Sequence, residues 1–278
     1  MSTSRTRRHT AVGSNAPISP VLETRDQPRS ENVFLFWPSI IGYIRIVLAI
    51  TSLYYMPVHP RRCSALYSLS CLLDAVDGFL ARYLDQASYF GAVLDMVTDR
   101  CTTACLLVFL SSAWPRWSIV FQGLICLDFA SHYVHMCTSL ILGGERSHKM
   151  VDEERSWLLN LYYSNKIVSF LLCFFNELFF IALYLLAFTS PPGDSEIEVV
   201  VANSPHGAGA FEIARANKLD PAWPLFLARI SFLGMLIKQL INVLQFVKAS
   251  TWLAESDVEM RRKRRSKSEN VRGKANKG

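Results

Sequence analysis

Four aspartates lie within two segments that otherwise consist largely of apolar residues: Asp74 and Asp77 in the first, Asp95 and Asp99 in the second. A carboxylate in the middle of a membrane span is unfavourable by about 2.5–3.5 kcal/mol on insertion scales. Four of them in one short stretch need a chemical reason. Together they can share cations, because hard ions such as Mg²⁺ and Mn²⁺ prefer carboxylate oxygen.

Small residues and an arginine share helix faces with these aspartates. In the second segment, Gly91, Asp95 and Asp99 follow one another at intervals of four residues along one face. In the first segment, five residues fall within an arc of about 140° when each residue turns the helix by 100°. These five are Asp74, Asp77, Gly78, Ala81 and Arg82.

This set of residues suits the binding of a diphosphate. Four carboxylates are enough for a two-metal site, with ions about 3.5–4 Å apart, of the kind used in phosphoryl transfer. Gly78, Ala81 and Gly91 leave room for a substrate, and Arg82 offers a planar fork suited to phosphate. A cation transporter is the alternative from another class, because acids inside membrane spans commonly mark ion pathways. It explains the aspartates, but it requires neither the small residues nor Arg82.

Long apolar segments must position these residues. Of the 278 residues, 51% are hydrophobic, and they occur in blocks rather than with an amphipathic period. About 20 apolar residues are enough to cross a bilayer. The pattern predicts an all-α, polytopic membrane protein with six transmembrane helices around a polar cavity on the cytosolic side. The six segments are 37–56, 63–84, 88–112, 117–141, 167–188 and 224–247.

Charged residues outside these segments predict how the chain crosses the membrane. Both termini and the loop 142–165 are basic, whereas the loop 189–222 begins with acidic residues. The positive-inside rule therefore places both termini and the loop 142–165 in the cytosol, and the loop 189–222 on the other side. We expect the loop 189–222 to be irregular, because it contains the runs SPPGD and NSPHGAG.

The same pattern divides the chain into three parts. Residues 1–32 are polar, lack the apolar core of a signal peptide, and predict a disordered basic tail. Residues 33–250 form the membrane domain, and residues 251–278 form a basic cytosolic tail. The run RRKRRSK matches a nuclear localisation signal, but six spans argue against that interpretation and against a nucleic-acid partner. Contact with anionic lipid head groups and a solvated, disordered tail are the remaining interpretations.

The aspartate stretch resembles the signature of a known family. The pattern D-x2-D-G-x2-A-R-x8-G-x3-D-x3-D is that of the CDP-alcohol phosphatidyltransferases, and this chain matches it without departure. The segments IIGYIRIV, FGAVLDMVTDRCTT, DFASHYVH and LYYSNK look like the eukaryotic branch that uses inositol. Two departures are Ser39, where the family commonly has Asn, and Lys166, where members of this branch usually carry Arg.

The resemblance implies transfer of the phosphatidyl group of CDP-diacylglycerol to myo-inositol, with release of CMP. It implies two Mg²⁺ or Mn²⁺ ions, a homodimer, and an endoplasmic reticulum membrane with the active site facing the cytosol. Glycerol 3-phosphate, serine and choline are the alternative acceptors. The roles implied for the motif are metal binding by Asp74, Asp77, Asp95 and Asp99, general base catalysis by Asp99, and donor binding by Gly78, Ala81, Arg82 and Gly91.

Polar residues elsewhere are candidates for the rest of the site. Arg45 either lines the phosphate cavity or extends to the cytosolic interface. Asp128 and His132, at i and i+4, line the acceptor pocket or form a structural hydrogen bond. His148 and Lys149 close over the acceptor or are solvated. Further candidates are Lys166, for the acceptor, and the buried pair Asn176 and Glu177, for structure.

Overall fold

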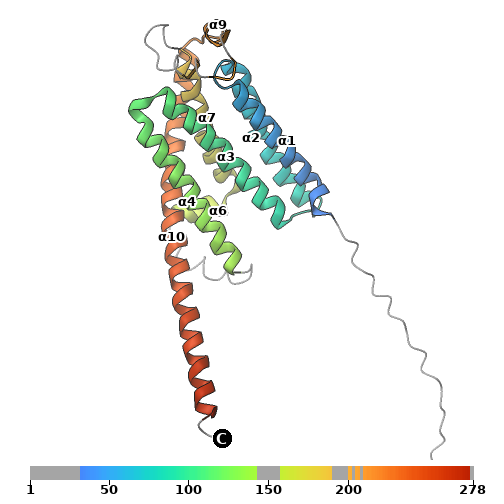
Figure 1. The fold of residues 1–278 in the computed structure, drawn as a ribbon, viewed down its shortest axis with the longest axis vertical. Coiled ribbons are helices and arrows are strands. Elements are labelled where there is room, and N and C mark those ends of the chain that lie inside the picture. The colour runs from blue at the N-terminus through green and yellow to red at the C-terminus, as the bar shows by residue number, and fades with distance from the viewer. Residues whose placement is uncertain (1–31, 143–156, 190–199, 202–203, 207–208, 276–278) are drawn as a thin grey trace, which may run out of the picture. The chain divides into compact units, whose positions relative to one another are not determined.

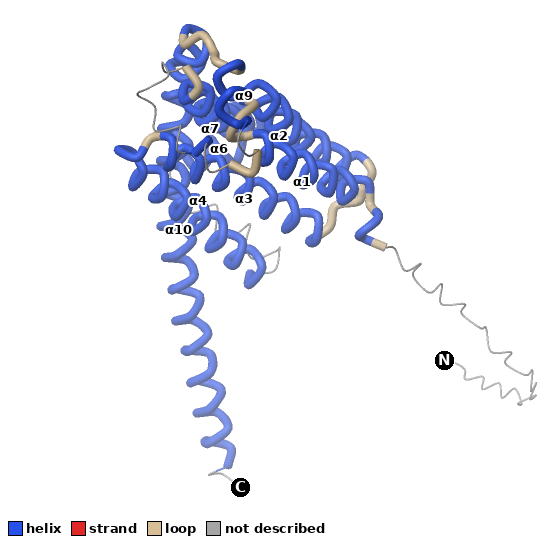
Figure 2. Tube along the Cα trace, turned by 45° about the horizontal axis from the view of Figure 1, so that its top comes forward, coloured by secondary structure: helices blue, strands red, loops and turns tan. Residues whose placement is uncertain are grey.

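The computed structural model describes residues 32–142, 157–189, 200–201, 204–206 and 209–275. Within these residues the regular elements are helices, and none is a strand (Figure 2). The prediction of an all-α protein is therefore confirmed for the described chain. The described helices belong to one unit, Val33–Gly278.

Six long helices coincide with the six predicted segments. Short helices connect or flank them: η1 (Val33–Leu35), η2 (Pro115–Trp117), α6 (Trp157–Ser164) and α9 (Ala210–Ala216). The long helices are α1 (Trp37–Tyr55), α2 (Pro60–Tyr83), α3 (Tyr89–Ala113), α4 (Ser118–Leu142), α7 (Lys166–Ala187) and α10 (Ala222–Ala275).

Four of these helices, α1, α2, α7 and α10, are long and apolar enough to cross a membrane by length and composition. The described part of the chain therefore contains four helices that could cross a membrane. In α3, the charges of Asp95, Asp99 and Arg100 interrupt the apolar sequence. The count of six spans stays a prediction.

Local sequence explains where several helices begin. Proline occupies the first turn of α1 and α2, where its missing N–H needs no partner. The Ser88 side chain caps α3 by accepting a hydrogen bond of 3.0 Å from the Gly91 amide. Asn165 caps α7 in the same way, accepting from the amides of Ile167 and Val168.

The helices pack in two groups that share α3. In the first, α1 lies along α2 and also contacts α3; in the second, α10 packs against α7 and α4, while α3 contacts α4 and α7 (Figure 1). The helix α1 is thus in contact with both segments that carry the aspartates. This packing lets a side chain from the first helix enter the site formed by the next two.

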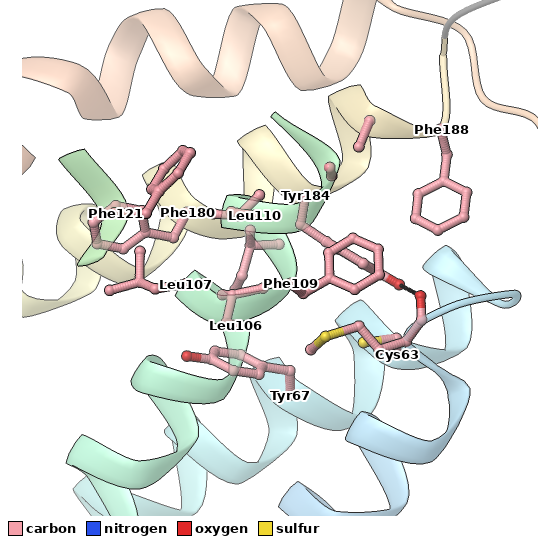
Figure 3. Packing of buried hydrophobic residues seen from close by; sticks show 14 of the residues in the cluster. Cys63, Tyr67, Leu106, Leu107, Phe109, Leu110, Phe121, Phe180, Tyr184 and Phe188 are labelled. Atoms are coloured by element: carbon pink, nitrogen blue, oxygen red, sulfur yellow. Dashed lines mark hydrogen bonds between the residues drawn. The ribbon is translucent and has the colours of Figure 1, made fainter. Parts of the chain in front are cut away.

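A buried apolar cluster occupies the C-terminal half of α3 and the helices around it. Phe109 packs edge-on against Tyr184, with ring centres 5.2 Å apart, and stacks on Phe188 at 6.2 Å. The Tyr184 hydroxyl donates a hydrogen bond of 2.8 Å to the carbonyl oxygen of Met56, so α7 is tied to the end of α1 (Figure 3). One helix, α3, therefore carries the core in its second half and the aspartates in its first.

Two segments expected to be irregular contain helix. Within 189–222, the structure has α9, and Val201 and Ala210 pack on buried Val58 in the α1–α2 connection. In place of a disordered tail, residues 251–275 continue α10. This stretch is rich in Ala, Glu, Lys and Arg, which favour helix, and Lys263 pairs with Glu259 at i, i+4 (3.5 Å).

The approach of α7 to α10 generates a stability prediction. A methyl group at Gly234 would lie 2.5 Å from Cβ of Phe175. We expect Gly234→Ala to destabilise the protein by about 1–3 kcal/mol, because the added carbon overpacks the contact. The measurement is the midpoint of thermal unfolding in detergent.

Gly123→Ala in α4 is the matched control. A Cβ added there meets no heavy atom within 4 Å, and alanine favours helix over glycine by about 1 kcal/mol, so this variant should unfold no earlier than the parent. A Gly234→Ala protein as stable as the parent would show that the two helices do not meet at this point.

Candidate active site

Three helices bring the predicted site together. The helix α2 carries Asp74 and Asp77, α3 carries Asp95 and Asp99, and α1 inserts Arg45 among the four carboxylates. One guanidinium nitrogen of Arg45 donates to Asp77 at 2.8 Å and to Asp95 at 2.6 Å. The other lies 2.9 Å from Asp74 and also donates to Asp99. All four acids of the motif therefore share one cation.

Arg45 is almost fully buried, with 1% of its surface exposed. A side chain extending to the membrane interface does not have this burial, so the structure favours the interpretation in which Arg45 lines the polar cavity. Ser70 supports the position by donating to the backbone carbonyl of Arg45 at 3.3 Å. The Nε of Arg45 is buried without a hydrogen-bond partner in the described chain. Such a group has unused capacity to donate.

Three of the four acids lie close enough together to hold a metal ion. Asp74, Asp95 and Asp99 each offer a carboxylate oxygen, and these three oxygens lie within 4.8 Å of one another. Their side chains keep 31–44% of their surface exposed, so an ion and a substrate can reach them. Asp77 is more buried and is held by Arg45. The donor set is of carboxylate oxygens only, which suits Mg²⁺ or Mn²⁺.

The small residues of the motif differ in what they do locally. A Cβ added at Gly78 would meet nothing closer than the Arg82 guanidinium, at 3.8 Å, so this face of α2 is open. Arg82 itself is exposed, and Ala81 is half-buried. Gly91 has a structural reason for its type, because a Cβ there would lie 3.1 Å from the Ser88 oxygen that caps α3.

A second buried charge network begins at the residue after Asp99. Arg100 donates to both carboxylate oxygens of Asp128, at 2.8 and 3.0 Å, and its other terminal nitrogen lies 3.6 Å from Asp99. His132 Nδ1 lies 2.8 Å from the backbone carbonyl of Asp128. The two candidate acceptor residues of α4 are therefore linked to the aspartate site through Arg100.

The helix α10 completes this network. Asn242 donates to Asp128 at 3.4 Å, and Lys238 donates to Asn242 at 2.7 Å. Lys238 is buried, and its ammonium lies 5.2 Å from the centre of the Tyr162 ring, a distance at which a cation is attracted to the ring face. Polar residues of α3, α4 and α10 thus satisfy one another inside the helix bundle.

A cavity of about 360 Å³ opens beside the aspartates. Arg45, Asp74 and Asp99 line it together with apolar residues of α7 such as Phe174. Glu177 of α7 also faces it and accepts hydrogen bonds from the Tyr67 hydroxyl (2.6 Å) and from Thr103 (3.1 Å). The cavity therefore has charged groups on one part of its wall and apolar groups on another, which suits an amphipathic ligand.

Of the remaining predicted acceptor residues, Lys166 is the one that the structure describes. Lys166 is exposed at the first position of α7, directly after the Asn165 cap. His148 and Lys149 lie outside the described residues. Sequence reasoning also missed four contributors: Arg100, Lys238 and Asn242 in the second network, and the cavity position of Glu177. The signal that found the aspartates, a charge inside an apolar segment, was present for Arg100, Glu177 and Lys238 as well.

Comparison with known proteins identifies the family of this chain. Residues 35–190 match the model of the CDP-alcohol phosphatidyltransferase family, and this range holds Arg45, the four aspartates and Asp128. The chain belongs to this family. No solved structure matches it.

Curated relatives narrow the class further. One in Schizosaccharomyces pombe is 45% identical over 86% of this chain and 97% of its own length. One in Saccharomyces cerevisiae is 41% identical over 85% and 94%, and one in Rattus norvegicus is 51% identical over 58% and 76%. Each of these relatives is named CDP-diacylglycerol–inositol 3-phosphatidyltransferase.

The Arg100–Asp128 pair generates a second stability prediction. Asp128→Ala removes the carboxylate to which the largely buried Arg100 donates from one terminal nitrogen, and breaking a buried pair in this way typically costs about 3–5 kcal/mol. We expect the thermal midpoint in detergent to fall by several degrees. Asp257→Ala, which removes an exposed carboxylate from α10, should leave it unchanged. Equal midpoints for the two variants would contradict a stabilising role of the pair.

Proposed function

We propose that this protein transfers the phosphatidyl group of CDP-diacylglycerol to myo-inositol, giving phosphatidylinositol and CMP. The observation that carries the proposal is the convergence of the four aspartates of the family motif around Arg45, with three acidic oxygens within 4.8 Å of one another. The names of relatives at 41–51% identity support inositol as the acceptor, over glycerol 3-phosphate, serine or choline.

In the proposed reaction the donor lies across the open face of α2. The absence of a side chain at Gly78 and the small side chain of Ala81 let the cytidine nucleotide approach, and Arg82 contacts phosphate. Gly91 keeps the start of α3 compact beside it. The acyl chains remain in lipid or enter the apolar part of the cavity. Two divalent ions held by Asp74, Asp77, Asp95 and Asp99 would neutralise the diphosphate and assist departure of CMP.

The chain's own groups then move one proton. Asp99 accepts the proton of an inositol hydroxyl, and the hydroxyl oxygen attacks the phosphorus that carries diacylglycerol. The bond from that phosphorus to the bridging oxygen of CMP breaks, so a phosphodiester forms and CMP leaves with the electron pair. Arg100, whose guanidinium lies 3.6 Å from the Asp99 carboxylate, holds that carboxylate in place for this transfer.

The acceptor is proposed to bind next to Asp99 on the side of α4. Asp128 and His132 lie there, joined to Asp99 through Arg100. Lys166 is proposed to reach the acceptor from the start of α7, and His148 and Lys149 from the adjoining loop. Neutral, hydroxyl-rich inositol would be recognised by these hydrogen-bonding groups rather than by a charge of its own.

The proposed arrangement in the membrane follows the charge pattern. Six spans place both basic ends and the loop 142–165 in the cytosol. The packing of Val201 and Ala210 on the α1–α2 connection supports a common side for these two loops, away from the cytosol. An endoplasmic reticulum location and a homodimer are proposed from the family resemblance.

A direct assay tests the function. Purified protein with CDP-diacylglycerol and Mg²⁺ or Mn²⁺ should release CMP when myo-inositol is added, and chelation of the metal should stop the release. Glycerol 3-phosphate, serine and choline should give no product. CMP release with one of these alcohols in preference to inositol would show that this alcohol, and not inositol, is the acceptor. Ion flux in vesicles without CMP release would favour a transporter.

Asp95→Asn and Asp99→Asn should each lower the rate of CMP release by at least about a hundredfold, the scale of general acid–base effects. An amide can neither accept the proton nor hold an ion as a carboxylate does. Asp85→Asn is the matched control: it lies in the nearby α2–α3 connector with φ of 52°, a conformation that Asn also tolerates. Normal turnover by either variant would contradict the role proposed for the substituted aspartate.

A further inference from the structure

Arg45 contacts the same carboxylates that could hold a metal ion. The three acids that could hold an ion are Asp74, Asp95 and Asp99, and the two terminal nitrogens of Arg45 pair with all three. These nitrogens also pair with Asp77. The single positive charge of Arg45 therefore neutralises part of the negative charge that a divalent metal ion would neutralise in this cluster.

The charges of the site do not balance with Arg45 in place. Counted as ionised groups, the four carboxylates and one guanidinium carry a net charge of −3, while the adjacent Arg100 is matched by Asp128. One divalent ion reduces the excess to a single negative charge. A second ion would reverse its sign in a partly buried site, where like charges repel more strongly than in water.

The donor changes this balance. The diphosphate of a CDP-lipid carries two negative charges, one on each phosphate, and it also offers oxygen ligands. When it arrives, a second divalent ion becomes favourable, and Arg45 has an alternative anion to bind. Its Nε is buried without a hydrogen-bond partner among the described residues, so the side chain can make a further hydrogen bond if its planar fork turns toward a phosphate.

We propose that Arg45 acts as an internal counter-cation: it occupies the position of one of the two divalent ions until the donor binds. The site then holds one ion in the absence of donor and two in its presence, with Arg45 transferred from carboxylates to phosphate. This inference rests on the proposed function, because it takes a CDP-activated lipid as the donor. It assigns Arg45 as a positioning residue that makes metal loading depend on substrate.

Counting bound ions tests the proposal without turnover. The full-length protein, stripped of metal by chelation and kept in detergent, is titrated with Mn²⁺, and free Mn²⁺ is measured by electron paramagnetic resonance. We expect one tightly bound ion per chain without donor. Two are expected with short-chain CDP-diacylglycerol in the absence of inositol, the second site gaining at least tenfold in apparent affinity.

Variants of Arg45 separate charge from a general loss of structure. Arg45→Gln should bind two ions without donor, and Arg45→Lys, which keeps the charge, should bind one. Arg62→Gln, which removes an exposed arginine at the start of α2, should behave as the parent. Two equivalent ions in the parent without donor, one ion in Arg45→Gln, or two in Arg45→Lys would each overturn the proposal.

The proposed function is measured separately on the same preparations. CMP release needs inositol, whereas the ion count does not. If CMP release is normal and the donor does not change the ion count, only the proposed role of Arg45 is contradicted, and the proposed transfer reaction is kept. If the ion count depends on donor but no acceptor gives CMP release, the proposed transfer reaction is contradicted, and the proposed role of Arg45 as a counter-cation is kept. If Arg45→Gln does not fold, the parent with and without donor still decides.

Discussion

The arrangement of this protein depends on one electrostatic constraint: charges inside an apolar helix bundle must be matched by other charges. Four aspartates on α2 and α3 would be strongly destabilising if each faced lipid alone. Arg45 resolves part of this conflict by contacting all four from α1. The same contact fixes how the first three long helices meet. The carboxylates proposed to form the active site and the contacts that hold the first three long helices together thus belong to one set of interactions.

The second network extends the constraint to the rest of the bundle. Asp99 and Arg100 are neighbours on α3, yet they belong to different clusters, one with α1 and α2 and the other with α4 and α10. A change in the packing of α10 can therefore reach the proposed general base through three side chains: Asn242, Asp128 and Arg100. Buried networks of this kind are stable when every member has a partner.

Sequence reasoning predicted the helices well and the contacts only in part. Apolar blocks placed all six long helices, because length and hydropathy are local properties of the chain. The face of α2 with Asp74 and the face of α3 with Asp95 were also accessible, since helical periodicity fixes which residues share a face. The position of Arg45 was left open between two interpretations, because its partners lie on other helices.

Other features depended on tertiary packing and could not be derived in this way. The link from Arg100 to Asp128 joins residues of different helices, and the contribution of Asn242 comes from more than a hundred residues further along the chain. The helical continuation of α10 was missed for a different reason. A run of basic residues suggests disorder by composition, although each of these residues also favours helix.

The cap at the start of α3 has a consequence for how this site can vary. Ser88 caps the first turn of α3 by accepting a hydrogen bond from the Gly91 amide. The direction in which Asp95 and Asp99 lie around the helix axis is therefore set by this cap and not by the length of the preceding connector. Extra residues inserted before Ser88 would lengthen the hairpin but leave both carboxylates on the same side of α3. A single residue inserted after Gly91 would turn them by about 100° away from Arg45. Tolerance to insertion should therefore change abruptly at one serine.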